Sequence, residues 1–299
     1  MDLWETISAS IRARVFGWSQ TRRPDLPITE VDRQFSRLMR RPIGGRYRAE
    51  APMFGQCFRA VDESDSALVI LKVLPDEPDG KGLLTHEYSV CSRLSHKRII
   101  RYHDIVSDSG FTVLVARYRE AAEFQRVAGP PAEASLSRDS VGLSGFHQLQ
   151  DALDYLHEQG LIHAGLSRDS VVIDRSGNVT VGNLMYSRVV RADGDSKPIG
   201  DHGRLMHGSP EHLTGLLTPE SDYFAVGILL FEYLLRRHPF WRVGLRAAFE
   251  RLRTDGGEAF LFDPRLYNTD RKVIGSLFSP DPAARREGWR LLRAMEARH

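Results

Sequence analysis

The 299-residue chain has few cysteines and no long apolar run, and each shortage excludes a class of protein. Its two cysteines, Cys57 and Cys91, lack the spacing of metal ligands and make no disulfide framework. No apolar run approaches the roughly 18 residues of a membrane-spanning helix, and the first residues lack the basic-then-apolar layout of a signal peptide. The net charge of +2 gives no reason to expect a nucleic acid as partner. We therefore expect a cytoplasmic globular protein.

Residues 1–44 are predicted to form a helical N-terminal extension. Its first part carries an apolar stripe at helical spacing, made of Leu3, Ile7, Ile11, Val15 and Trp18. After two prolines, Thr29 opens a second helical pattern that contains Phe35 and Leu38. We expect these stripes to dock on the following domain or on a partner protein. Arginines beside the first stripe leave a lesser alternative, in which residues 1–23 contact a membrane.

From Tyr47 onward the pattern predicts a strand-rich part and then a mostly helical part. The expected elements are strands 47–52, 56–61 and 67–74, a helix over 82–94, strands 100–106 and 112–118, a helix over 144–159, and short strands 171–173 and 179–181. Strands followed by helices are not a βαβ alternation, so a parallel sheet is not expected. The sequence therefore predicts an α+β fold.

A lysine and a glutamate in this first part form a candidate pair. Lys72 ends the apolar strand Val69-Ile70-Leu71-Lys72, and Glu87 follows in the predicted helix. Only five of the 41 basic residues are lysine, which makes the position of Lys72 notable. A flexible ammonium group must be held by a carboxylate to act as a fixed charge near a phosphate. Alone, such a pair is a weak signal, because most are solvated.

A longer motif follows the predicted helix 144–159. It runs His163-Ala164-Gly165-Leu166-Ser167-Arg168-Asp169-Ser170, and after two short predicted strands comes Asn183-Leu184-Met185. This order resembles the H-R-D-L-x-x-x-N catalytic loop and the D-F-G metal loop of protein kinases. The strand Val69–Lys72 likewise resembles the family's V-A-I-K. The chain thus resembles the protein kinase superfamily, in particular its Ser/Thr-kinase-like members.

Segments farther along the chain carry the same resemblance. They are Ser209-Pro210-Glu211, similar to A-P-E; the helix 221–232; His238-Pro239-Phe240; and the run Asp281–Arg285. In the family, the aspartate at position 222 ties down the catalytic loop, and the glutamate at 211 pairs with the arginine at 285. A buried carboxylate is tolerated only when it is paired or hydrogen-bonded. We therefore expect Asp222, Glu211 and Arg285 to be buried and paired.

The resemblance covers about residues 45–293 and implies a two-lobed kinase-like domain over residues 45–299. The N-lobe, residues 45–118, would hold a small antiparallel sheet with one main helix. The C-lobe, residues 119–299, would be larger and helical. With residues 1–44 as the helical extension, this is the expected domain layout.

The residues that carry out phosphoryl transfer in the family are missing here. Gly165 stands where the family has the aspartate that accepts the substrate proton, a base that contributes on the order of 10²–10⁴ in rate. Ser170 and Asn183 stand at the two metal-ligand positions, without carboxylate charge for a hard cation. Of the glycine-rich phosphate loop only Gly55 remains. We therefore expect no catalytic residue and no metal site.

Nucleotide binding is expected to be weak for two further reasons. Ile70 replaces the small alanine beside the adenine, and Glu50 brings a like charge to the phosphate loop. ATP, if it binds at all, would contact Lys72, Glu87 and Gly55, without magnesium.

The leading hypothesis is a pseudokinase that acts as a protein-binding or regulatory module. It requires no cofactor, and its partner is another protein. The alternative is an active but atypical ATP-dependent protein kinase or nucleotide-dependent transferase that uses Lys72, Glu87 and Asn183. In that case Asp169, otherwise a solvated loop carboxylate, could serve as a displaced base. A nucleotide-sensing module without catalysis lies between the two.

Overall fold

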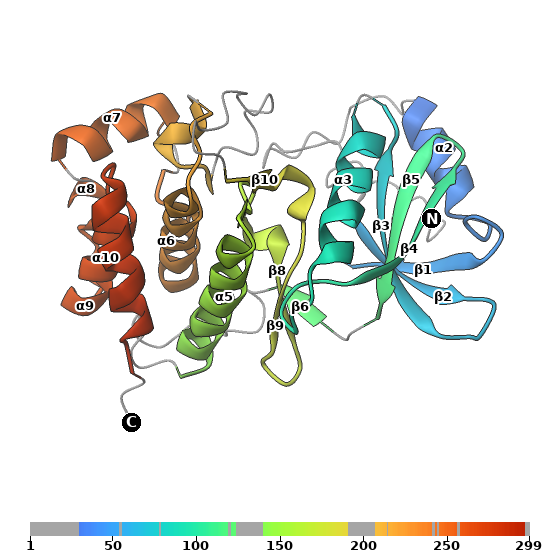
Figure 1. The fold of residues 1–299 in the computed structure, drawn as a ribbon, viewed down its shortest axis with the longest axis horizontal. Helices are drawn as coiled ribbons and strands as arrows, with labels where there is room; N and C mark the ends of the chain where they lie inside the picture. The colour runs from blue at the N-terminus through green and yellow to red at the C-terminus, as the bar shows by residue number, and fades with distance from the viewer. Residues whose placement is uncertain are drawn as a thin grey trace. The chain divides into compact units, whose positions relative to one another are not determined.

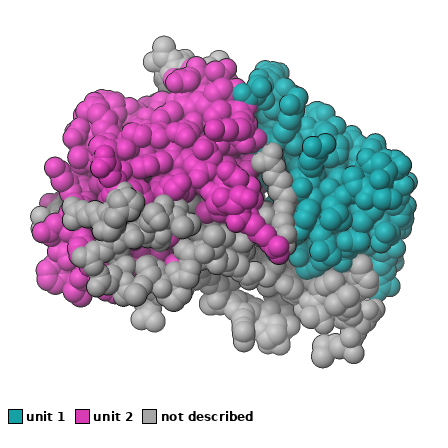
Figure 2. All heavy atoms as spheres, turned by 90° about the horizontal axis from the view of Figure 1, so that it is seen from below, with its two compact units in different colours: residues 1–95, 100–120 teal, residues 96–99, 121–299 magenta. Residues whose placement is uncertain are grey.

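The computed structural model describes residues 30–53, 56–77, 79–118, 121–123, 140–190, 207–213, 215–240, 243, 245–255 and 258–296. The first predicted helix, residues 3–18, and Gly55 lie outside these ranges. The chain forms two compact units (Figure 2). The first contains Met1–Ser95 and Ile100–Glu120, and the second contains His96–Ile99 and Ala121–His299.

The first unit is built on a five-stranded sheet (Figure 1). Its strands are β1 (Tyr47–Pro52), β2 (Cys57–Asp62), β3 (Leu68–Pro75), β4 (Tyr102–Asp108) and β5 (Phe111–Arg117). They pair in the order β1-β2-β3-β5-β4, and every neighbouring pair is antiparallel. The antiparallel sheet predicted from the sequence is therefore confirmed.

β4 begins two residues later than predicted, and the preceding residues 96–99 belong to the second unit. There Ile99 forms a parallel bridge with Val181, and the ring of His96 stacks on Tyr155 with centroids 4.7 Å apart. An apolar pair such as Ile99-Ile100 predicts burial, but it does not reveal which of two cores receives each residue.

One face of this sheet carries an apolar core shared with α2 (Glu30–Leu38). Alternate residues of β3 point to it, as a strand period of two requires. The ring of Phe35 on α2 lies 5.5 Å from that of Phe58 and 5.6 Å from that of Phe111. The docking expected for the second helical pattern is thus confirmed, and residues 35–43 contribute to the same core as the sheet.

The opposite face of β3 carries Ile70 and Lys72, and here α3 (Gly80–Arg93) contacts the sheet. The buried positions on α3 are Gly80, Leu84, Glu87 and Cys91, spaced by four, three and four residues. This spacing is one face of an α-helix. It therefore directs the Glu87 carboxylate toward the buried face of the sheet that carries Lys72.

The second unit is mostly helical (Figure 1). Its helices are α5 (Ser140–Glu158), α6 (Pro219–Leu235), α7 (Leu245–Asp255), α8 (Glu258–Leu261), α9 (Asn268–Leu277) and α10 (Pro282–Arg293). Its short strands are β6 (Ala121–Glu123), β7 (Leu161–Ile162), β8 (Val171–Asp174), β9 (Val179–Val181) and β10 (Arg188–Val189). Its described residues also form the 3₁₀ turns η2 (Arg168–Ser170), η3 (Leu184–Tyr186) and η5 (Pro210–Leu213). The α+β class predicted from the sequence is confirmed.

Helix α6 lies at the centre of the second unit and is buried along most of its length. It begins with a capping box between Thr218 and Ser221, with Pro219 in the first turn, where its missing N–H costs nothing. A helix that is apolar on all sides belongs inside a core. The central helix expected over 221–232 is therefore confirmed, and its observed bounds are wider.

Among the described residues, no helix is both long and apolar enough to cross a bilayer.

Candidate functional site

Lys72 and Glu87 form a buried ion pair in the first unit. Their side chains are 6% and 0% exposed, and the Lys72 Nζ contacts the Glu87 Oε2. The hydroxyl of Tyr102, at the start of β4, donates to the other carboxylate oxygen, Oε1, at 2.8 Å. Burial and the charge of Glu87 raise the pKa of Tyr102 well above its ordinary value, so this hydroxyl stays a donor. The glutamate is therefore held from two sides, and the ammonium group is fixed in place.

Nothing in the sequence singled out Tyr102, because a tyrosine at the start of a strand is ordinarily a core residue. Ile70, by contrast, lies where it was expected. It is on the Lys72 face of β3, 9% exposed, and pairs with Arg59 and Ala116 on the neighbouring strands. The Glu50 carboxylate forms an ion pair, since the Arg59 Nε lies 3.2 Å from its Oε2. That pairing reduces the repulsion of phosphate that the sequence predicted.

In the second unit, Asp222 on α6 holds the backbone of the catalytic-loop segment. Its Oδ2 accepts the His163 N–H at 2.8 Å, and its Oδ1 accepts the Ala164 N–H at 3.0 Å. Oδ2 also lies 2.8 Å from His157 Nε2. Burial alone would raise the pKa of Asp222, but these contacts lower it below the ordinary value. The expected role of Asp222 as a buried anchor is confirmed.

The side chains around this loop also fix its position. His163 is fully buried, and its Nε2 lies 3.0 Å from the carbonyl oxygen of Gly182, as expected for a packing residue. His212 of η5 accepts the Ser209 N–H at its Nδ1, 3.0 Å away, and its Nε2 lies 3.2 Å from the Ala164 carbonyl. No pattern in the sequence indicates a role for His212, although this residue directly follows the Ser209-Pro210-Glu211 motif. It ties that motif to the catalytic loop.

The space beside Gly165 is filled by another side chain. A Cβ at position 165 would lie 2.8 Å from the Cδ2 of Tyr186 and 3.1 Å from its Cβ. Real Cβ atoms essentially never come so close to a neighbouring atom, so any larger residue here requires η3 to shift. The position that the resemblance assigns to the base therefore carries no carboxylate, and the Tyr186 side chain occupies the space where a Cβ would lie. Tyr186 had no signal in the sequence, because its contact with Gly165 arises only when the two loops meet.

The two former metal-ligand positions differ in their surroundings. Ser170 is fully buried, and its Oγ donates to the Gly165 carbonyl and accepts the Ser167 N–H, both at 3.2 Å. Its hydroxyl therefore serves the start of η2 rather than a cation. Asn183 begins η3 with a φ of 65°, a left-handed conformation that asparagine tolerates well. The Gly182 N–H donates to the Ser170 carbonyl at 2.9 Å, which brings the two loops together.

These side chains do not fit a magnesium ion. Mg²⁺ binds through carboxylates, phosphates and water in octahedral geometry. Ser170 is engaged in its turn, and Asn183 offers an amide. Asp169 is exposed in η2, as expected for a solvated loop carboxylate.

Replacing Gly165 by alanine is expected to lower the free energy of unfolding by about 1–3 kcal/mol, because its Cβ overpacks against Tyr186. Urea unfolding measures the change. Gly82→Ala in α3 is a matched control, since a Cβ there meets nothing within 4 Å. That control should gain about 0.5–1 kcal/mol from the better helix propensity of alanine. In a Tyr186→Ala background, Gly165→Ala should cost less, and an equal loss in both backgrounds would contradict the contact.

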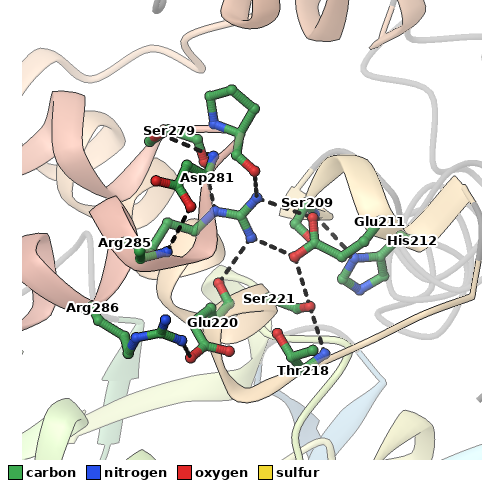
Figure 3. Close-up of polar contacts among 12 residues, drawn as sticks. Ser209, Glu211, His212, Thr218, Glu220, Ser221, Ser279, Asp281, Arg285 and Arg286 are labelled. Atoms are coloured by element: carbon green, nitrogen blue, oxygen red, sulfur yellow. Dashed lines mark hydrogen bonds and ion pairs between the residues drawn. The ribbon is translucent and has the colours of Figure 1, made fainter. Parts of the chain in front are cut away.

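The polar cluster around Arg285 forms the main buried ion pair of the second unit (Figure 3). The fully buried guanidinium of Arg285 binds the Glu211 carboxylate through both terminal nitrogens, with Nη2 to Oε2 at 3.0 Å. Its Nε donates to the Ser279 carbonyl at 2.6 Å, and Nη1 to the Glu220 carbonyl at 3.2 Å. The predicted Glu211–Arg285 pair is confirmed, with one correction. The Glu211 side chain is 18% exposed, because one edge of η5 faces solvent.

Comparison with known proteins supports the resemblance to protein kinases. The chain matches the Protein kinase domain family over residues 53–290. It is 26% identical over 263 residues to a protein of Mus musculus named Inactive serine/threonine-protein kinase PLK5, covering 83% of this chain and 42% of that relative. It is 25% identical over 234 residues to CBL-interacting serine/threonine-protein kinase 21 of Arabidopsis thaliana, covering 76% of this chain and 51% of the relative.

A bacterial relative shows the same level of similarity. Serine/threonine-protein kinase PrkC of Bacillus subtilis is 26% identical over 208 residues, covering 67% of this chain and 31% of the relative. The chain spans about half or less of the length of these curated relatives. The family match covers well over half of the chain and coincides with the segments described above, so this chain belongs to the protein kinase superfamily.

Proposed function

We propose that the chain is a pseudokinase that acts as a protein-binding or regulatory module, with absent or very weak phosphoryl transfer. One observation carries the proposal: the Tyr186 side chain occupies the space beside Gly165, where a Cβ would lie 2.8 Å from the Tyr186 Cδ2. A missing carboxylate alone could be replaced by a neighbour. A site with no space for a base near the catalytic-loop backbone is far harder to repair.

The former metal-ligand positions support the same proposal. The Ser170 hydroxyl is hydrogen-bonded to the backbone at the start of η2, and Asn183 provides no carboxylate. Phosphoryl transfer depends on positioning and on electrostatic stabilisation by metal ions, so losing both the base and the metal ligands removes its main contributions. One relative is described by its own name as inactive, whereas others are named as kinases. The partner we propose is another protein, and no cofactor is required.

The purified 299-residue chain is expected to transfer no phosphate to itself or to a generic protein substrate from Mg-ATP or Mn-ATP. The measurement is incorporation of radiolabelled phosphate, with Lys72→Ala as the background. Wild type and variant should give the same signal. Robust transfer by the wild type that disappears in Lys72→Ala would contradict the proposal and favour the atypical kinase.

That second candidate has one specific observation in its favour, the intact Lys72–Glu87 pair held by Tyr102. In active kinases the corresponding pair must be in place for catalysis. A buried ion pair between strand and helix can equally be retained for the structure alone. Nucleotide binding distinguishes these roles.

ATP is expected to shift the thermal midpoint of the protein little, and equally with and without Mg²⁺. Ligand that binds only the native state must raise the midpoint by mass action, so the shift reports affinity directly. The buried Ile70 side chain lies on the same face of β3 as Lys72, and we expect it to reduce the space for an adenine ring. Since Ser170 and Asn183 provide no carboxylate for Mg²⁺, we expect the shift not to depend on magnesium. Ile70→Ala should increase any shift, and Glu63→Ala in the exposed turn after β2 serves as a control. A large shift that requires Mg²⁺ would show a working nucleotide site.

A further inference from the structure

Three titratable side chains of the second unit meet beside α6, outside the degenerate catalytic positions. Glu232 projects from α6, His238 lies in the turn that follows it, and His207 precedes the Ser209-Pro210-Glu211 motif. One ligand atom from each residue lies within 4.8 Å of the other two. The end of α6 with its following turn, and a segment 25 residues before Glu232, therefore place two imidazoles and one carboxylate around a common point.

The carboxylate at the centre of this cluster is almost completely buried. Glu232 is 3% exposed, and its Oε2 lies 3.0 Å from the Nε2 of His207. The rings of His207 and His238 meet edge to face, with centroids 5.4 Å apart and planes at 82°. A buried carboxylate needs partners of positive charge or hydrogen-bond donors. Burial alone would raise the pKa of Glu232, but the nearby histidines and Arg168 lower it, so the group is ionised.

We propose that His207, Glu232 and His238 bind a divalent transition-metal ion. Two imidazoles and one carboxylate are a ligand set that suits zinc. Zinc is held by imidazole nitrogens and carboxylate oxygens at about 2.0–2.2 Å, which places two ligands of one tetrahedral ion about 3.4 Å apart. The His207–Glu232 distance of 3.0 Å is already close to that value. Small side-chain rotations bring in His238, and a water or a fourth ligand completes the tetrahedron. Magnesium and calcium prefer oxygen ligands, so two imidazoles select against them.

Three present contacts must give way when the ion binds. The hydrogen bond between His207 Nε2 and Glu232 Oε2 is replaced by two metal–ligand bonds, and its proton leaves Nε2. The Phe240 N–H donates to the Nδ1 of His238 at 3.1 Å, so the ring must release this bond and move its proton to coordinate through Nε2. The Arg168 Nε lies 3.7 Å from the Glu232 Oε2. The Arg168 side chain is 42% exposed and can turn into solvent. The ion then takes the place of the arginine charge beside the carboxylate.

A metal ion at this point would connect the segment before Ser209 to the central helix. Position 207 lies two residues before the motif whose Glu211 binds Arg285. The ion would therefore fix the entry to that motif through metal–ligand bonds to α6. This role is independent of phosphoryl transfer and of nucleotide.

The test is a titration of the 299-residue chain with Co²⁺, which reports tetrahedral nitrogen and oxygen coordination by visible absorption. One equivalent is expected to give the tetrahedral spectrum, and one equivalent of Zn²⁺ should remove it. His207→Asn and His238→Asn should each abolish the band. Glu232→Gln should raise the dissociation constant at least tenfold, and Arg168→Gln should lower it. His103→Asn, an exposed histidine of β4, is the control and should leave the spectrum unchanged.

Two results would overturn the site. One is a wild-type protein that gives no tetrahedral cobalt spectrum. The other is a spectrum that persists in both histidine variants, which would assign the metal to other residues. Zn²⁺, but not Mg²⁺, should also raise the thermal midpoint of the wild type by mass action. That readout remains informative even if one ligand variant folds poorly.

Discussion

Replacing Arg285 by alanine is expected to lower the free energy of unfolding by about 3–5 kcal/mol, the usual cost of breaking a buried ion pair. The guanidinium is fully buried, bound to Glu211 and to three carbonyl groups, and it lies 5.3 Å from the ring centroid of Phe224. Its removal leaves a carboxylate and these carbonyls without their donor. Chemical denaturation of wild type and variant measures the difference.

The neighbouring arginine provides the matched control. Arg286 pairs with Glu220 at 2.5 Å, but its side chain is 51% exposed. Arg286→Ala should cost less than Arg285→Ala, because the Arg286 guanidinium is half exposed and solvent screens its pairing with the largely buried Glu220. If both variants were equally stable, Arg285 would not hold the scaffold position that its contacts indicate.

The same comparison has a defined pH dependence. Burial alone would raise the pKa of Glu211, but hydrogen bonding and the charge of Arg285 bring it below the ordinary value. A carboxyl group with a lowered folded pKa stabilises the protein above its unfolded pKa, about 4.3, and loses that contribution as the pH falls through the folded value. The stability gap between wild type and Arg285→Ala should therefore be complete at neutral pH and shrink below about pH 4.

Replacing Glu87 by alanine is expected to cost about 3–5 kcal/mol in the first unit. The substitution would leave the ammonium group of Lys72 buried without its carboxylate, and the hydroxyl of Tyr102 without its acceptor. Thermal or urea unfolding of the variant measures the loss. Glu63→Ala is the control, because the Arg48–Glu63 pair is 51% and 41% exposed. This control should change stability by less than about 1 kcal/mol.

A combined variant separates the cost of the buried charges from the cost of lost packing. Replacing Lys72 by methionine, Glu87 by leucine and Tyr102 by phenylalanine removes every polar member of the group together. Buried ion pairs replaced by apolar residues of similar size are often neutral or stabilising. The triple variant should therefore recover most of the stability lost in Glu87→Ala. If it remained as unstable as the single variant, packing rather than charge would explain the loss.

Much of the fold could be predicted because its signals are local in the sequence. The alternation of β3 placed Lys72 and Ile70 on one face, and the spacing of α3 placed Glu87 on its buried side. The long apolar run of α6 predicted a helix enclosed by the core. The resemblance to protein kinases also predicted the Glu211–Arg285 pair, and it assigned Gly165, Ser170 and Asn183 to the positions of a base and two metal ligands.

Other features depend on how distant segments meet, and no local pattern encodes them. The sequence showed a glycine at 165, but only the folded chain brings Tyr186 into the space of the missing base. Tyr102 reaches Glu87, and His207 meets Glu232, for the same reason. The sequence by itself determined the class of fold and which residue types stand at positions 165, 170 and 183. Only the tertiary structure decided what occupies the space around them, because side-chain contacts across loops follow from the path of the whole chain.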